Sequence, residues 1–248
     1  KTPAEAHGVD LLFVCTKYTQ LRDSLPDIET ITDKHTMVVS LLNGVDSEEL
    51  IGQRIGMEHM IYSLIRIASH RIGNSIHFSL PKGYNGIYIG IPNQPACQDP
   101  RLAAIAEIFA DTPVTLHLSD DILLDMWDKF GLNVSRNLPQ AILGVGIGAY
   151  DDSTYADAIM RQMRHEVVLV ANAKGIPLKE EFKAGKWLPS QRYSTLQDLD
   201  AHRHTEIDMF SGALIRMGKE VGVECPYNEM TYNLIKALEE KNDGKFDY

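Results

Sequence analysis

The chain has 248 residues, enough for one large domain or two ordinary ones, with 44% hydrophobic and 23% charged residues as in ordinary globular proteins. The formal net charge of -10 argues against a nucleic-acid-binding protein, because no basic surplus exists to replace the counterions of phosphate groups. We find no apolar run near the roughly 20 residues of a membrane span and no signal peptide at the polar start. Cys15, Cys97 and Cys225 lie far apart, which predicts a reduced, cytoplasmic protein without a metal site.

The first part of the chain alternates between short apolar runs and helical patterns. The runs typical of buried strands are 10–16, 36–42 and 59–66, and the helical patterns between them are 19–30 and 47–55. This order predicts βαβ units with right-handed crossovers and a parallel sheet.

The pattern then changes. Short alternating runs at 74–79 and 86–91, separated by turn residues, predict a β-hairpin. A helix is expected over 101–109, after Pro100, and a last strand over 113–118.

Helices dominate from Ser119 onward. Ser119 is the expected cap of the first of them, and Thr205-Glu206-Ile207-Asp208 resembles a capping box that opens a later one. The long helices are predicted at 157–174, 205–222 and 228–241. We therefore place a domain boundary near Leu118, with an α/β domain over 1–118 and an all-helical domain over 119–248.

The most informative stretch runs from Met126 to Asn137. Lys129, Asn133 and Asn137 are spaced four residues apart, which puts them on one face of an α-helix. A solvated face more often carries better helix formers than Asn, and a dry core would leave the amides without partners. A polar cleft for a small oxygenated molecule fits this stripe, although an exposed lysine with incidental asparagines fits the spacing equally well.

Two further candidates follow strands of the predicted sheet. Lys17 follows the first strand and Asn43-Gly44 follows the second. Ligands of open α/β sheets bind beyond the carboxyl ends of the strands, so these positions are candidates for cofactor contacts. An exposed loop lysine and a plain turn are the alternatives.

Other motifs are weaker. Gly144-Val145-Gly146-Ile147-Gly148 follows a helix and not a strand, so we interpret it as a helix end or a close-packing segment and not as a phosphate loop. His202 and His204 lack a third nearby ligand and are expected at the surface. Glu206 fits the first turn of a helix on structural grounds alone, and Ser194 lies in the expected loop before it.

Taken together, these motifs resemble the ketopantoate reductase (2-dehydropantoate 2-reductase) family. The resemblance runs along almost the whole chain. It rests on Trp127-Asp128-Lys129 followed by Asn133 and Asn137, on Thr205-Glu206-Ile207-Asp208 preceded by Ser194-Thr195-Leu196-Gln197-Asp198-Leu199, on Leu42-Asn43-Gly44-Val45 and on Thr16-Lys17. It implies a Rossmann-type domain followed by a helical domain, with the active site between them. The implied reaction is the NADPH-dependent reduction of a 2-keto acid to a 2-hydroxy acid, a step of pantothenate biosynthesis.

The resemblance also implies residue roles. Lys129 would be the general acid that protonates the ketone oxygen, and Glu206 would bind near the substrate hydroxyl. Asn133, Asn137 and Ser194 would bind the carboxylate and hydroxyl groups of the substrate. The cofactor NADP would be contacted by Lys17 and Asn43. A nearby ammonium group stabilises the alkoxide that develops on hydride addition, so the chemistry agrees with these roles.

Two departures from the family pattern keep alternatives open. We find no GxGxxG segment, which predicts that about 60 residues of the first βαβ unit precede Lys1 and that this chain alone binds cofactor weakly. Residues 63–68 replace a glycine-rich strand end, which leaves the substrate open. The alternatives are a related NAD(P)-dependent dehydrogenase for another hydroxy or amino acid, and a non-catalytic binding module. The apolar helical faces are compatible with a homodimer. The expected small-molecule partner is a 2-keto acid substrate.

Overall fold

A computed structural model describes residues 2–67, 69–72, 75–78, 83, 85–182 and 188–248. The chain divides into two compact units, Lys1–Met126 and Trp127–Tyr248. A domain boundary near Leu118 remains a prediction. No helix among the described residues is both long and apolar enough to cross a membrane.

The first unit is built on a five-stranded sheet with the order β1-β2-β3-β6-β7. Its strands are β1 (Leu11–Val14), β2 (Met37–Ser40), β3 (Met60–Arg66), β6 (Gly86–Gly90) and β7 (Leu116–Leu118). The helical elements of this unit are η1 (Pro3–Ala6), α1 (Tyr18–Ile31), α2 (Ser47–Ile55), η2 (Met57–His59), η3 (Ala96–Gln98) and α3 (Pro100–Phe109). β1, β2 and β3 are parallel neighbours, which confirms the predicted βαβ units.

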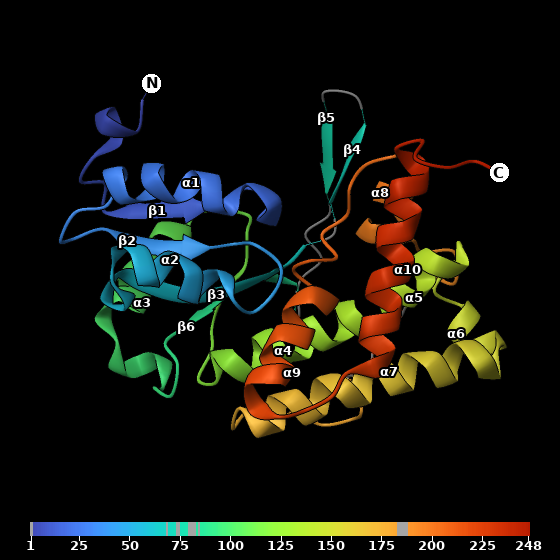
Figure 1. The fold of residues 1–248 in the computed structure, drawn as a ribbon. Helices are drawn as coiled ribbons and strands as arrows, with labels where there is room; N and C mark the ends of the chain where they lie inside the picture. Colours follow the sequence, from blue (N-terminus) through green and yellow to red (C-terminus); the bar gives the residue numbers. More distant parts are fainter. Residues whose placement is uncertain (1, 68, 73–74, 79–82, 84, 183–187) are drawn as a thin grey trace. The chain divides into compact units, whose positions relative to one another are not determined.

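Helices cover both faces of this sheet (Figure 1). On one face, Leu102 and Ile105 of α3 pack with Val39, Ile61 and other buried strand residues. The neighbouring Val38 is also fully buried, and α1 and α2 lie on the other face. Burial of both faces is the reason why these strands read as continuous apolar runs and not as alternating ones.

The predicted hairpin of 74–79 with 86–91 is wrong. β5 (Ser75–Phe78) pairs instead with β4 (Ser69–Ile72) in a separate two-stranded sheet. β6 joins the main sheet, antiparallel to β3 and parallel to β7. The two runs differ in burial: all of β5 is exposed, whereas Ile87 and Ile89 of β6 are core residues. Residues 74 and 79 of the predicted strand lie outside the described residues.

A buried polar network joins the end of β2 and the middle of β3 to the first turn of α2. The Ser47 hydroxyl donates to Glu48 Oε2 at 2.9 Å and lies 2.8 Å from the Ser40 hydroxyl. Ser63 donates to the Ser40 carbonyl oxygen. Glu48 itself is only 1% exposed. Burial disfavours its charged form and raises the pKa of Glu48 to about 7.

Glu48→Gln should therefore stabilise the protein at alkaline pH. The folded state holds the Glu48 proton up to about pH 7, whereas the unperturbed side chain releases it near 4.5. The contribution of Glu48 to stability thus falls as the pH rises between these values and stays low above them. At pH ~8 we expect a gain of about 3 kcal/mol in the free energy of unfolding, measured in urea, because a pKa shift is worth ~1.4 kcal/mol per unit.

The same measurement near pH 4 should show little difference between Glu48→Gln and the wild-type protein. Glu49→Gln, at the exposed neighbour on α2, is the matched control and should change neither curve. A gain that is equal at both pH values would contradict the assignment of the proton to Glu48.

The second unit is helical. Its elements are the end of α4 (Ile122–Leu132), η4 (Asn133–Asn137), α5 (Leu138–Leu143), α6 (Ala149–Asp152), α7 (Thr154–Ala173), α8 (Ser194–Asp200), α9 (Ser211–Val221) and α10 (Pro226–Asn242). Met163, Val167 and Val170 of the long helix α7 are fully buried. α10 packs against α7 and α9 (Figure 1). The predicted long helices are confirmed, with different ends.

Two of these ends differ for a clear reason. The cap of α4 is Asp121 and not Ser119, because Asp121 Oδ1 accepts from the Leu124 N–H at 3.2 Å. Ser119 accepts from the Asp121 N–H and donates to Asp125. α9 begins at Ser211 and not at Thr205, because the backbone of Phe210 (φ -90°, ψ -97°) leaves the helical region.

Candidate functional site

Lys129 lies in the last turns of α4. The apolar face of this helix, Ile122, Met126 and Phe130, is at most 2% exposed and anchors it. Lys129 is half-buried beside that face. The helix thus holds the Lys129 stem against protein while leaving part of the side chain accessible.

A π-helical turn, η4, follows α4 and replaces the uninterrupted α-helix that the spacing predicted. Its cause is Pro139, which has no N–H and whose ring would clash with the Ser135 carbonyl in an α-helix. The Ser135 hydroxyl donates to the Gly131 carbonyl oxygen at 2.6 Å. Turns of this kind occur often at functional sites. Asn133 and Asn137 are the first and last residues of the turn.

Arg164 of α7 packs against the turn of α4 that precedes η4. The Arg164 side chain is 1% exposed, and its Nη2 donates to the Lys179 carbonyl oxygen at 2.7 Å. The same nitrogen lies 3.6 Å from Asp128 Oδ1, next to Lys129 in sequence. Burial lowers the pKa of Arg164, and Asp128 opposes that shift. Arg164 is thus a buried cation beside the carboxylate of Asp128, the residue before Lys129.

Asn137 and Ser194 are brought together. Asn137 Nδ2 donates to Ser194 Oγ at 3.4 Å, and its Oδ1 accepts from the Thr195 N–H at 3.3 Å. Asn137 is 2% exposed, whereas Ser194 is exposed and is the first residue of α8. The expected loop at Ser194 is therefore wrong. The Asn137 amide satisfies an N–H group of the first turn of α8, which otherwise lacks a side-chain cap.

Gln140, one turn after Asn137, supports the same segment. Its Nε2 donates to the Gln191 carbonyl oxygen and its Oε1 accepts from the Tyr193 N–H, each at 2.8 Å. Burial raises the pKa of Tyr193 to about 12, so that phenol stays neutral. Sequence reasoning missed Gln140, although its spacing of three from Asn137 was a usable signal.

Glu206 lies in a non-helical segment between α8 and α9 and is half-buried. Its carbonyl oxygen accepts from the N–H groups of Met209 and Phe210, at 3.0 and 3.2 Å. The Thr205 hydroxyl accepts from the Ile207 N–H at 3.2 Å, which is the local bond expected of a cap although no regular helix follows directly.

In the first unit, Lys17 and Asn43 follow the paired ends of parallel strands. Val14 and Ser40 are partners in the register of β1 and β2, and each candidate lies three residues beyond its strand end. Their expected placement at one edge of the sheet is confirmed. Lys17 is exposed at the start of α1, and Asn43 is half-buried in the loop before α2.

This edge can accept an oxygen-rich ligand. Thr16 Oγ1 is buried and has no hydrogen-bond partner in the part of the chain that the structure describes. The hydroxyl, the Lys17 ammonium and the Asn43 amide are all donors, which suits ribose and phosphate oxygens. The residues present therefore fit a nucleotide cofactor.

The weaker motifs have structural explanations. Gly144 (φ 68°) ends α5 in the left-handed conformation that glycine adopts readily. A Cβ at Gly146 would lie 2.3 Å from the Pro189 carbonyl oxygen, which confirms a close-packing segment. His202 and His204 are exposed, as expected, and His204 contacts Asp243 at 3.0 Å.

Sequence comparison agrees with this arrangement. Residues 1–94 match the family described as "Ketopantoate reductase PanE/ApbA", and residues 121–239 match its C-terminal part. The chain belongs to the ketopantoate reductase family. The resemblance seen in the sequence is thus confirmed, as are the Rossmann-type fold with a helical C-terminal part and membership of an oxidoreductase family.

Individual relatives are moderately similar. The 2-dehydropantoate 2-reductase of Streptococcus pyogenes is 29% identical over 250 residues, covering 96% of this chain and 78% of the relative. A ketopantoate reductase structure from Ralstonia eutropha has a TM-score of 0.81 at 25% identity, covering 97% of this chain and 79% of the other. A D-mandelate dehydrogenase solved with NADH and anilino(oxo)acetate has a TM-score of 0.82 at 25% identity, covering 97% and 80%.

Proposed function

We propose that the protein reduces the ketone of 2-dehydropantoate to pantoate with NADPH, a step of pantothenate biosynthesis. Its relatives are named 2-dehydropantoate 2-reductase. The observation that carries the proposal is the similarity to such a reductase over 96% of the chain. The family match over 121–239 contains both the α4–η4 segment and the segment of Glu206.

Lys129 is the proposed general acid. A ketone oxygen gains alkoxide character as hydride adds to its carbon, and an adjacent ammonium stabilises that charge and donates the proton. Half-burial of Lys129 favours this role, because the charge acts more strongly where water is partly excluded. The buried Arg164 pairs with Asp128, the residue before Lys129.

The substrate-binding roles are proposals, as is the role of Lys129. Asn133 and Ser194 would donate to the carboxylate and hydroxyl oxygens of the substrate, and Glu206 would accept from the substrate hydroxyl. Asn137 is buried and bonded to Ser194 and Thr195, so we assign it the task of orienting Ser194 in addition to substrate contact.

A nicotinamide cofactor supplies the hydride when it is bound. Lys17 and Asn43 would hold its ribose and neighbouring groups, together with the Thr16 hydroxyl. The preference for NADPH over NADH is part of the proposal, since a related dehydrogenase was solved with NADH.

A second candidate is an NADH-dependent dehydrogenase of another 2-hydroxy acid. The observation in its favour is the TM-score of 0.82 to D-mandelate dehydrogenase. Both candidates use the same chemistry at the ketone, so the difference lies in the side chain of the 2-keto acid and in the cofactor.

A substrate panel tests the proposal. The protein from the complete gene is offered 2-dehydropantoate, phenylglyoxylate and other branched 2-keto acids, each with NADPH and with NADH, and cofactor oxidation is followed. We expect kcat/KM to be at least tenfold higher for 2-dehydropantoate with NADPH than for any other pair. Preference for phenylglyoxylate with NADH would establish the second candidate, and cofactor binding without turnover of any 2-keto acid would contradict both.

A further inference from the structure

The segment that carries Glu206 is not held by a regular helix of its own. α8 ends at Asp200 and α9 begins only at Ser211. A carboxylate on such a segment needs other contacts to keep a fixed direction. These contacts come from α10.

Glu239 of α10 binds Thr205, the residue before Glu206. Its Oε1 accepts from the Thr205 N–H and from the Thr205 hydroxyl, each at 2.7 Å. The same hydroxyl accepts from the Ile207 N–H at 3.2 Å. The Glu239 carboxylate is only 3% exposed. It is bonded directly to Thr205, before Glu206, and is connected through the Thr205 hydroxyl to Ile207, after it.

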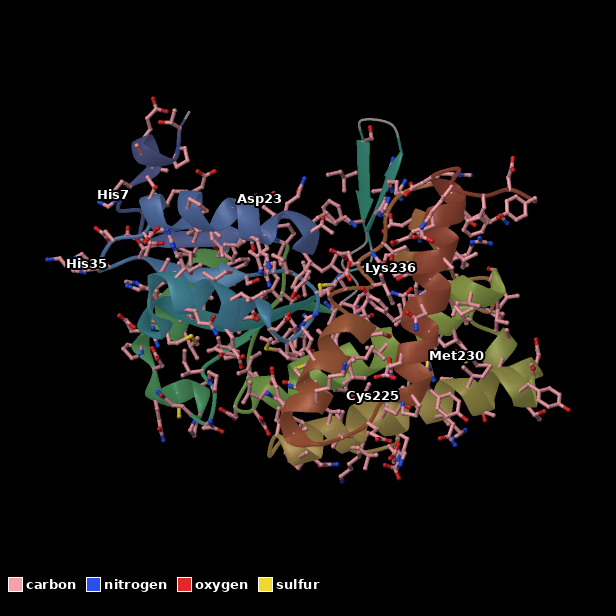
Figure 2. The ribbon with its side chains drawn as sticks, in the orientation of Figure 1. His7, Asp23, His35, Cys225, Met230 and Lys236 are labelled. Atoms are coloured by element: carbon pink, nitrogen blue, oxygen red, sulfur yellow. The ribbon has the colours of Figure 1, made fainter. Side chains whose placement is uncertain are left out.

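Two more residues of α10 extend this arrangement. Lys236 Nζ lies 3.1 Å from Glu239 Oε2 and 3.3 Å from Asp208 Oδ2, so it bridges the two carboxylates. The Tyr232 hydroxyl donates to Asp208 Oδ1 at 2.7 Å. Figure 2 labels Lys236 on the ribbon of α10. We call Tyr232, Lys236 and Glu239 the α10 clamp.

The ion pair with Lys236 offsets the cost of burying the Glu239 carboxylate. Burial by itself would lower the pKa of Lys236, but the carboxylates of Glu239 and Asp208 outweigh it and raise that pKa. His204 Nδ1 also lies 3.5 Å from Glu239 Oε2. A carboxylate that accepts two hydrogen bonds and an ion pair is held in one orientation.

We propose that Glu239 is a positioning residue, which fixes the direction in which the Glu206 carboxylate meets the distal hydroxyl of the substrate. This inference rests on the proposed function, because it takes Glu206 as the group that binds that hydroxyl. The inference also concerns specificity: the α10 clamp would determine the preference for 2-keto acids that carry this distal hydroxyl over those that lack it.

The test compares two substrates that differ in that hydroxyl alone. Trimethylpyruvate is 2-dehydropantoate without its hydroxyl oxygen, so it uses the same ketone chemistry without the contact to Glu206. We expect Glu239→Gln to lower kcat/KM for 2-dehydropantoate roughly tenfold or more, since small misplacements of a binding group are costly. For trimethylpyruvate the change should be less than about twofold. Glu240→Gln, at the exposed neighbour that pairs with Lys245, is the matched control and should change neither.

A second variant covers the case in which Glu239→Gln does not fold. Thr205→Val keeps the shape of the side chain but removes the hydroxyl that links Glu239 to the Ile207 N–H. It should produce the same selective loss, and Thr205→Ser should restore the wild-type preference. An equal loss on both substrates, or no loss, in Thr205→Val would overturn the inference.

Failure of the proposed function gives a different result. In that case the wild-type protein itself would not prefer 2-dehydropantoate over trimethylpyruvate, and Glu206→Gln would leave the ratio unchanged. If Glu206→Gln abolishes the preference but Glu239→Gln and Thr205→Val do not, the proposed function stands and the positioning role of Glu239 is wrong.

Discussion

Lys129→Ala should lower kcat for the reduction of 2-dehydropantoate by about 10²–10⁴-fold, the usual contribution of a general acid. The substitution removes both the proton donor and the positive charge that stabilises the developing alkoxide. Lys129 lies in the last turns of α4, where Ile122, Met126 and Phe130 anchor the helix independently of it. The helix should therefore stay folded, and the effect should appear in kcat more than in KM.

The measurement is steady-state cofactor oxidation with both wild-type and variant protein from the complete gene. Lys219→Ala, at an exposed lysine of α9, is the control and should keep full activity. Lys129→Arg keeps the charge but is a poor proton donor, because its guanidinium stays protonated. Lys129→Arg should therefore retain substrate binding without recovering turnover. Unchanged kcat in Lys129→Ala would refute the assigned mechanism, whatever the substrate.

Gly131→Ala should destabilise the helical unit by about 3 kcal/mol or more. A Cβ at Gly131 would lie 2.0 Å from Arg164 Nη1, and Arg164 is a fully buried side chain. Overpacking of a core typically costs 1–3 kcal/mol. Arg164 has a further cost, because moving it breaks its contacts with Asp128 and the Lys179 carbonyl oxygen, and a broken buried ion pair is expensive.

Urea unfolding followed by a probe in the helical unit measures this effect. Gly212→Ala of α9 is the comparison variant, because its Cβ would lie 3.3 Å from Tyr232 Cε2, a close approach that a shift of a few tenths of an ångström in the ring relieves. Alanine is the better helix former by ~1 kcal/mol, so this control should be neutral or slightly stabilising. If Gly131→Ala behaved like Gly212→Ala, the close packing of Arg164 against α4 would not be the constraint that we infer.

The two variants together distinguish a loss of catalysis from a loss of stability. Lys129→Ala is expected to affect turnover with little effect on stability, whereas Gly131→Ala is expected to affect stability first. Because Gly131 lies two residues after Lys129 on the same helix, its variant should also lower kcat. That loss should be smaller than the loss in Lys129→Ala, since the amine is still present.

Local sequence patterns determined much of this protein. Apolar runs of strand length and helical patterns between them were sufficient for β1, α1, β2, α2 and β3, because these elements bury both faces of a sheet. The spacing of Lys17 and Asn43 after successive strands placed them at one edge, since parallel strands end together. The Lys129–Asn137 and Thr205–Asp208 motifs indicated the family together with Thr16-Lys17 and Leu42-Asn43-Gly44-Val45.

Only the tertiary structure decided the rest, because it depends on partners distant in sequence. The pairing of β6 with β3 and not with β5 follows from burial. In the sequence, Glu239 and Arg164 resemble ordinary residues of a helix. In the structure both are buried, Glu239 bonded to Thr205 and Arg164 next to Asp128. Local patterns report which residues favour a helix or a strand, whereas hydrogen bonds across 34 residues, as from Thr205 to Glu239, depend on how the helices pack.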